Sequence, residues 1–332
     1  QSCAKSSAGH SRVLDLLYCI RDQHDLRLVI LAAGVCLLST MTAVLMIRQA
    51  NLAQAPASAR NWTLLGGLAT GFGIWATHFI AMLGYDPGFI AGYDPGLTVS
   101  SLAIVLTATI GAFLLARTVR TRAGLGTAAV LFGGGFAAMH YVGMAALEMP
   151  AMIRWNGAYV ALSLVLAVAP LYPAFALAVH HRTRIAFAAA GLLMTMAAVG
   201  LHFSGMTAIT LVPSRLQPEA AMLSPSAMSI VVSSVSIALL ALCLAGWVMA
   251  RRTRAAIAAT ERQLGILVRG ISDCAIYMLD RQGRVANWNP GAQRLKGYAM
   301  EDAVGRPLSL FYTPEDVVAE APARALSIAA TQ

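Results

Sequence analysis

The chain has 332 residues, of which 58% are hydrophobic and only 12% are charged, with a formal net charge of +9 and a mean hydropathy of +0.67. Soluble globular proteins carry about a quarter charged residues, so this composition excludes an ordinary soluble enzyme and indicates a polytopic membrane protein. Most arginines border apolar segments, which argues against nucleic-acid binding. The five cysteines form no C-x-x-C pair, which argues against a disulfide framework or a thiolate metal site.

An N-terminal segment, residues 1–27, precedes seven apolar segments. Each has about the 20 residues that a membrane-crossing helix needs. Short connections join them, so residues 28–250 are predicted to form one all-α bundle of seven transmembrane helices. The predicted spans are 28–47, 62–84, 97–117, 125–147, 158–179, 185–211 and 228–250.

The distribution of arginines around the spans predicts the orientation of the bundle. Arginines cluster after the first, third, fifth and seventh spans, whereas the alternate loops hold only Arg154 and Arg215. Positive residues remain on the cytoplasmic side, so the N-terminus is predicted outside and the C-terminus in the cytoplasm. Arg21 and Arg27 precede the first span and favour the opposite orientation, but aspartates are interleaved with them.

Three histidines recur at equal spacing in the even-numbered spans. His78 and His140 are 62 residues apart, as are His140 and His202. In each copy an aromatic residue follows the histidine directly, and a methionine follows it at four positions: Phe79, Tyr141 and Phe203, then Met82, Met144 and Met206. An equal period with matching flanks indicates an internal repeat. Each repeat consists of two spans, and the seventh span lies outside the repeats.

Residues four apart lie on one helical face, so each histidine–methionine pair can face a shared centre nearer the outer surface. Imidazole binds several transition metals, and thioether selects copper, especially Cu(I). No carboxylate or cysteine lies on these faces, which argues against magnesium, calcium and structural zinc. The predicted ligands to copper are His78, Met82, His140, Met144, His202 and Met206. In the alternative interpretation, histidines hydrogen-bond between helices and methionines fill gaps. The threefold repetition favours the metal site.

The loop GYDPGFIAGYDPG (84–96) contains a local duplication. Asp-Pro-Gly is typical of turns, and this is the predicted role of both copies. The alternative is that Asp86 and Asp94 attract cations near the outer surface.

The segment after the seventh span predicts a signalling helix in residues 251–270. Ile257, Leu264 and Ile271 are seven apart, with Thr260 and Leu267 between them. This stripe fits a dimeric coiled coil through 251–271 or an ordinary amphipathic helix.

The last segment, 271–332, has an α/β pattern. CAIYMLDRQGRVANWNP (274–290) predicts two strands joined by a tight turn at Asp280–Gly283, and a helical stretch follows at 291–305.

These motifs resemble two known families. Met139-His140-Tyr141 matches the name motif of the MHYT domain, a bacterial integral-membrane sensory module, and the likeness covers about residues 24–250. It implies a bacterial inner-membrane location, a copper site near the outer face, and sensing of oxygen, carbon monoxide or nitric oxide. Thr77 and Leu201 replace the first Met in the other copies and Phe replaces Tyr, so Met139 and Tyr141 are weaker candidate ligands. Ala81 also replaces the glycine found at positions 143 and 205, so the first copy is expected to pack less closely.

The pattern D-x-x-G-x-V-x-x-W-N, with L-x-G-Y after it, resembles the opening of a PAS domain over roughly 265–332. The chain begins at Gln1, and this resemblance leaves the PAS fold incomplete, so we expect a fragment. By resemblance, a kinase or cyclic-nucleotide output module is expected downstream.

The combined expectation is the non-enzymatic sensory input region of a membrane signalling protein, a homodimer through 251–271 and PAS, in contact with lipid and not with nucleic acid. A gas or redox change at the copper site would be relayed through the seventh span. Two alternatives are a haem or electron-transfer protein, since His and Met are both axial ligands, and a metal or proton transporter. The sequence shows no interrupted helices around a central acid, which favours signalling.

Overall fold

The computed structural model describes residues 24–53, 55–88, 91–214 and 222–331. Most of the N-terminal segment 1–27, and Arg215, therefore lie outside the described residues. The chain divides into two compact units that meet between Ala250 and Arg251. Each unit is described by itself.

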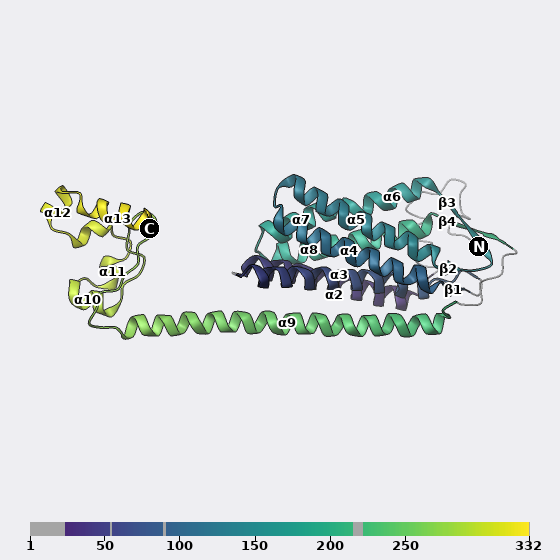
Figure 1. Ribbon diagram of the computed structural model, residues 1–332, viewed down its shortest axis with the longest axis horizontal. Helices are drawn as coiled ribbons and strands as arrows, with labels where there is room; N and C mark the ends of the chain where they lie inside the picture. Colours follow the sequence, from purple (N-terminus) through teal and green to yellow (C-terminus); the bar gives the residue numbers. More distant parts are fainter. Residues whose placement is uncertain (1–23, 54, 89–90, 215–221, 332) are drawn as a thin grey trace. The chain divides into compact units, whose positions relative to one another are not determined.

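Among the described residues, seven helical spans are long and apolar enough to cross a membrane, which confirms the predicted seven-span bundle (Figure 1). The spans are α2 (Leu26–Leu52), α3 (Pro56–Leu83), α4 (Pro95–Thr118), α5 (Arg122–Ala145), the pair α6 (Gly157–Val168) and α7 (Leu171–His180), α8 (Arg184–Thr207), and α9 (Pro225–Gly270).

The helix caps follow the same 62-residue period as the histidines. Asp94 caps α4, and Asn156 caps α6 at the equivalent position. Thr121 and Thr183 cap α5 and α8 in the same way. Each side-chain oxygen accepts a backbone N–H from the first helical turn, which satisfies a donor that the helix itself leaves unpaired. The repeat therefore includes the helix starts as well as the histidine motif.

Both copies of Asp-Pro-Gly have local backbone roles. Asp86 accepts the amide of Gly88 at 2.9 Å in a turn, and Asp94 accepts the amide of Leu97 at 2.6 Å as the helix cap.

Replacement of Asp94 by alanine is expected to lower the free energy of unfolding by about 1 kcal/mol and to leave metal content unchanged. Denaturant titration and elemental analysis of the variant would check both expectations. A loss of bound metal would favour the cation role instead.

The fifth span is interrupted, which differs from the expectation of continuous helices. Pro170 has no amide hydrogen, so it cannot continue the helical hydrogen bonds, and α6 ends at Val168 before α7 begins at Leu171. No aspartate or glutamate occurs in helices α2 to α8 or in residues 225–250 of α9. The interruption therefore lacks the central acid that would favour a transporter.

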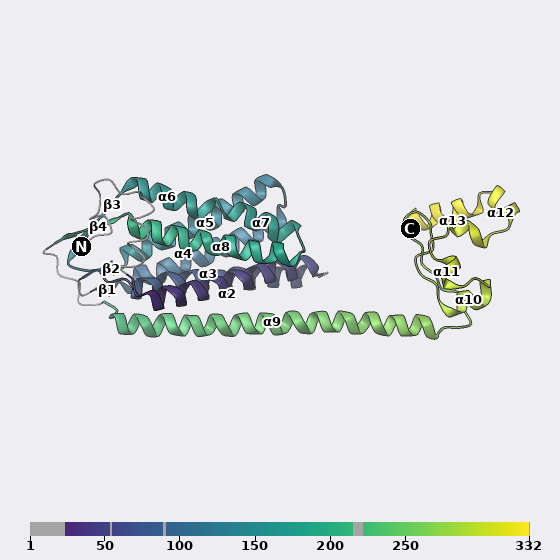
Figure 2. The same ribbon diagram turned by 180° about the vertical axis from the view of Figure 1, so that it is seen from behind.

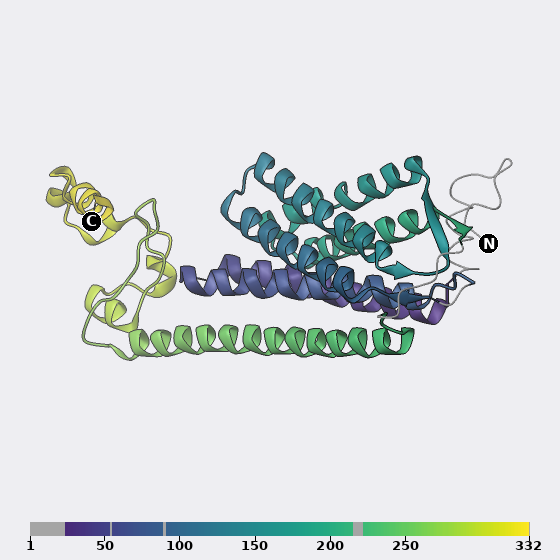
Figure 3. The same ribbon diagram turned by 45° about the vertical axis from the view of Figure 1, so that its right-hand side comes forward.

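Short strands close one end of the bundle, where the sequence predicted that the fourth and sixth spans continue to 147 and 211. Helix α5 ends at Ala145 and α8 at Thr207 instead. Strand β1 (Gly92–Tyr93) pairs antiparallel with β2 (Leu147–Glu148), and β3 (Ala151–Trp155) with β4 (Ile209–Pro213). Both pairs lie at the same end of the bundle (Figures 1, 2 and 3). We call this end, together with the β-bridge between His24 and Tyr85, the hairpin end.

Glycines bring the two helices of a repeat close together. A Cβ on Gly73 would overlap Ser39 of α2, and a Cβ on Gly135 would overlap Ala108 of α4. Gly73 lies five positions before His78, and Gly135 lies five positions before His140. These glycines allow close backbone approach between the two helices of a repeat.

The seventh span and the signalling helix are one continuous helix, α9, rather than two elements. Within the first unit, its buried residues include Val232, Leu239, Cys243, Gly246 and Ala250. Their spacing of three and four is that of a heptad. Ile257 and Leu264 continue this heptad pattern, because Ile257 lies seven residues after Ala250 and Leu264 lies seven residues after Ile257.

The second unit begins with the predicted tight turn. The amide of Gly283 donates to the carbonyl of Asp280 at 3.0 Å, and Gly283 has a φ of +72°, which confirms the turn. The strands on either side are reduced to a bridge between Leu279 and Val285. Backbone bonds such as that from the amide of Ala286 to the carbonyl of Met278 join the two segments. Side chains add to them: Asn289 accepts the amide of Ile276, and Asn287 accepts that of Met278.

The helical stretch predicted at 291–305 is two helices, α10 (Pro290–Lys296) and α11 (Met300–Ala303). Gly297 adopts a left-handed φ of +77° and ends α10, as glycine commonly does at a helix C-terminus. A 3₁₀ turn η1 (Leu308–Phe311), α12 (Pro314–Val318) and α13 (Ala321–Thr331) follow. Aromatic residues form the small core: Trp288 stacks on Phe311 with ring centroids 5.0 Å apart, and Tyr277 and Tyr298 pack against Phe311.

Candidate metal centre

The three repeated histidines meet inside the bundle. His78 on α3, His140 on α5 and His202 on α8 are all buried. Their ring nitrogens include one set, one atom per residue, that lies within 4.8 Å of one another. The Nδ1 of His78 is 3.3 Å from the Nδ1 of His140 and 3.3 Å from that of His202. We call these residues the three-histidine centre.

The Nδ1 separations suit a bound transition-metal ion. Two imidazole nitrogens that share a metal at about 2.0–2.1 Å, at a tetrahedral angle, lie roughly 3.4 Å apart. Each neutral imidazole has one lone pair and one N–H. Lone pairs that converge in a buried site repel one another unless a proton or a cation lies between them. The 3.3 Å spacing fits N–H···N hydrogen bonds between the rings, and the same donor set fits a metal held through Nδ1.

The opposite ring nitrogens are held by packing. The Nε2 atoms of His78, His140 and His202 are buried and have no hydrogen-bond partner among the residues that the structure describes. In many metal sites this second nitrogen donates to a carboxylate, a carbonyl or a water. Here a Cβ on Gly143 would lie 2.5 Å from Nε2 of His78, and one on Gly205 would overlap Nε2 of His140. Each of these rings is seated against the helix of the next repeat.

The repeated methionines are buried one turn beyond the histidines, at 2% exposure or less. Met82 lines a cavity of about 240 Å³ together with Tyr85 and Tyr93. Met144 lines a separate cavity of about 660 Å³ beside Tyr141 and Trp155. Met206 is buried in the same apolar core. The structure thus gathers the imidazoles, while the thioether ligands remain a prediction.

The two weaker candidates have structural contacts. Met139 is fully buried in the apolar core. The hydroxyl of Tyr141 lies 2.6 Å from the hydroxyl of Ser163 on α6, and its ring packs edge-on against Trp155. This hydroxyl is therefore engaged with α6.

Sequence reasoning missed a fourth buried histidine beside the centre. His24 is 6% exposed, and its ring centroid lies 6.2 Å from that of His202 and 5.5 Å from that of Phe203. The available signal was its position directly before the cap of α2, Asp25. Tyr93 nearby is also buried, and burial raises its pKa to about 12, so it supplies no phenolate at neutral pH.

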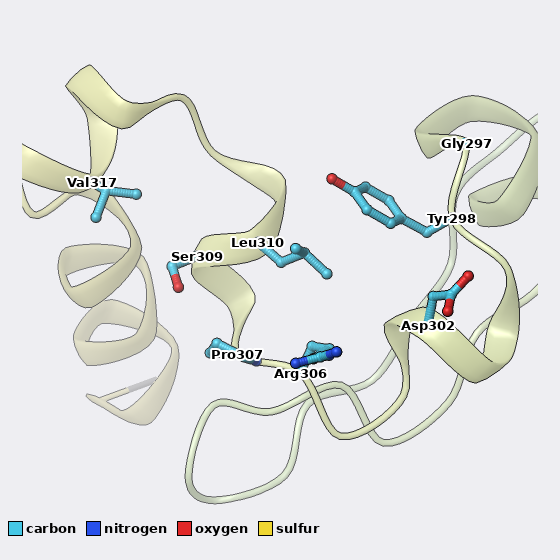
Figure 4. A pocket seen from close by; sticks show the side chains of 8 residues that line it. All are labelled: Gly297, Tyr298, Asp302, Arg306, Pro307, Ser309, Leu310 and Val317. Atoms are coloured by element: carbon cyan, nitrogen blue, oxygen red, sulfur yellow. The ribbon is translucent and has the colours of Figure 1, made fainter.

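Another cavity lies in the second unit, lined by residues between Gly297 and Val317. It has a volume of about 650 Å³, and Figure 4 shows Tyr298, Asp302 and Arg306 on its walls with the apolar Leu310 and Val317. Because the lining combines opposite charges with apolar groups, it selects no single class of ligand.

The geometry defines a multi-pass membrane protein with a buried imidazole centre, and comparison with known families agrees. The profile of the MHYT family, the N-terminal repeat of bacterial signalling proteins, matches residues 71–129 and 133–191. The PAS fold matches residues 267–330. The chain therefore carries two matched MHYT repeats followed by a PAS domain. The third copy, around His202, lies outside the matched ranges.

The chain is similar to several bacterial signalling proteins. An "uncharacterized signaling protein" of Caulobacter vibrioides is 35% identical over 298 residues, 89% of this chain and 36% of that protein. The bifunctional diguanylate cyclase/cyclic di-GMP phosphodiesterase MucR of Pseudomonas aeruginosa is 38% identical over 188 residues, 54% of this chain and 27% of MucR. The cyclic di-GMP phosphodiesterase NbdA of the same organism is 36% identical over 194 residues, 55% of this chain and 24% of NbdA.

The chain thus covers between 24% and 36% of the length of each of these three relatives. No solved structure matches it. The domains present are sensory, and they identify a membrane sensory input region of a signalling protein.

Proposed function

We propose that the bundle senses its signal through a copper ion held by His78, His140 and His202, with Met82, Met144 and Met206 as further ligands. The observation that supports this most is the position of His78 Nδ1, which lies 3.3 Å from the Nδ1 atoms of both His140 and His202, among helices α3, α5 and α8 that contain no acidic residue. Thioethers one turn away favour copper over harder ions. Copper, when bound, would offer a coordination position for a diatomic gas such as oxygen, carbon monoxide or nitric oxide, or a redox change.

The packing of α9 provides a route from the centre to the second unit. Leu239 of α9 is buried beside Ala69 of α3, and a Cβ on Gly73 would lie 3.3 Å from Leu239. Gly73 is five residues before His78 on the same helix. A shift of α3 that accompanies a change at His78 would therefore press directly on α9, which continues unbroken to Gly270.

The distribution of arginines supports an orientation in which the hairpin end faces outward and the PAS domain is cytoplasmic. In the proposed whole protein, α9 and the PAS domain form a homodimer. Similarity to MucR and NbdA supports a cyclic di-GMP enzyme as the downstream output.

Replacement of both His140 and His202 by alanine is expected to abolish stoichiometric copper binding, because it leaves one of three imidazoles. Elemental analysis of detergent-purified protein, loaded under reducing conditions, measures this directly. The matched control replaces His180 and His181, two exposed histidines at the other end of the bundle, and should retain the parent's copper. Full copper in the first variant would show that the site is elsewhere.

A further inference from the structure

The same pattern of backbone pairing occurs three times at the hairpin end, once in each repeat. In each repeat, the residue directly before the cap of the first helix forms a β-bridge with the residue seven positions after the motif histidine. The bridges join His24 to Tyr85, Tyr93 to Leu147, and Trp155 to Ile209. Backbone hydrogen bonds repeat as well: the amides of the three caps, Asp25, Asp94 and Asn156, donate to the carbonyls of Gly84, Ala146 and Ala208.

The side chains before the caps join neighbouring repeats. The ring of Tyr93 packs on Phe79, with centroids 5.9 Å apart, and the ring of Trp155 packs on Tyr141 at 5.2 Å. Phe79 and Tyr141 directly follow a motif histidine of the preceding repeat. His24 joins the first repeat to the third in the same way: its ring packs on Phe203 with centroids 5.5 Å apart, and Phe203 directly follows His202.

His24 therefore occupies a position where the other two repeats have a bulky aromatic residue. Packing alone is satisfied by tyrosine or tryptophan there. A histidine fills less space but adds ring nitrogens, and it does so beside His202, with ring centroids 6.2 Å apart and an interplanar angle of 75°. Two imidazoles that share one ion at about 2.0–2.1 Å have ring centres roughly 5 Å apart at a tetrahedral angle and roughly 6.4 Å apart in a linear arrangement, so 6.2 Å fits a wide ligand–metal–ligand angle. The departure from the repeat thus places a potential metal ligand next to one member of the three-histidine centre.

We propose that His24 and His202 form an outer metal-binding position, through which a copper ion passes into the three-histidine centre. This inference rests on the proposed function. The surroundings support it: Tyr85 packs against His24 with ring centroids 5.3 Å apart, and Tyr85 and Met82 line the cavity of about 240 Å³ at the hairpin end. Tyr85, which lines that cavity, thus contacts His24, and His24 in turn contacts His202 of the centre.

Two substitutions at His24 separate binding from packing. His24→Phe keeps a ring against Phe203 and Tyr85 but has no donor atom, whereas His24→Met keeps a soft donor without the ring. The experiment follows the transfer of Cu(I) from a chelator of known affinity to the full chain in detergent. Tyr93→Phe, at the equivalent position of the second repeat, is the matched control.

We expect His24→Phe to load copper at least tenfold more slowly than the parent while reaching the same final copper content. We expect His24→Met to recover most of the rate and Tyr93→Phe to match the parent. The inference is overturned if His24→Phe loads at the parent's rate, if His24→Met is no faster than His24→Phe, or if Tyr93→Phe is equally slow. The His78/His140/His202 triple alanine variant tests the proposed function separately. Copper uptake by that variant equal to the parent's would refute the centre itself, whatever the His24 variants do.

Discussion

Replacement of Gly143 by alanine is expected to lower copper affinity by about 10- to 100-fold, the size of effect seen when groups that orient metal ligands are removed. The added Cβ would lie 2.5 Å from Nε2 of His78 and 3.0 Å from its Cδ2, so the ring must move. Metal ligands tolerate displacements of only about 0.5 Å. Because no hydrogen bond to a described residue holds Nε2, the ring's position depends on this packing. Competition with a Cu(I) chelator measures the affinity.

Helix α5 supplies the matched control for this substitution. A Cβ on Gly134 would meet nothing within 4 Å, so Gly134→Ala should bind copper like the parent and gain up to about 1 kcal/mol of helix stability. Equal copper affinity in Gly143→Ala and Gly134→Ala would contradict the role assigned to Gly143 in positioning the ring of His78.

The second large effect concerns the proposed dimer. Replacement of both Leu264 and Leu267 by aspartate is expected to convert the dimer to a monomer. Both side chains are more than half exposed on α9 and lie on the heptad face. Burial of a leucine stabilises an interface by on the order of 1.5–3 kcal/mol, so each substitution weakens the dimer by more than tenfold. Light scattering of the full chain in detergent measures the mass.

Ile266 provides the control for this pair. It is 68% exposed on the same helix but lies off the heptad face, so Ile266→Asp should leave the mass unchanged. A dimer that survives in the double variant, or that Ile266→Asp also dissociates, would place the interface elsewhere.

The number of spans and the histidine repeat could be predicted from the sequence because both depend on local composition and spacing. Twenty apolar residues predict a span regardless of its neighbours, and the 62-residue period of His78, His140 and His202 indicates equivalent positions.

The ends of the helices were harder to predict, because long-range pairing decides them. Residues 146–147 and 208–211 are mostly apolar and could continue a helix, but Leu147 pairs with Tyr93 and Ile209 pairs with Trp155. The place of His24 beside His202 also depends on the closure of the threefold arrangement. Only a comparison of the residues before Asp25, Asp94 and Asn156 would have indicated it.

The choice of Nδ1 as the converging atom was also beyond the sequence. Spacing places an imidazole on a helical face, but its ring orientation depends on the neighbouring helix. Gly143 and Gly205, three positions after motif histidines of later repeats, allow the Nε2 edges of His78 and His140 to turn outward. The sequence showed these glycines, although not which ring each one accommodates.

X-ray absorption at the copper edge tests the central claim most directly, with reduced, copper-loaded protein measured beside its His78/His140/His202 triple alanine variant. The three-histidine centre predicts about one copper per chain with at least two imidazole nitrogens at about 2.0 Å, and a variant without bound copper. A parent that binds no copper, or a variant with the parent's copper content and spectrum, would contradict it.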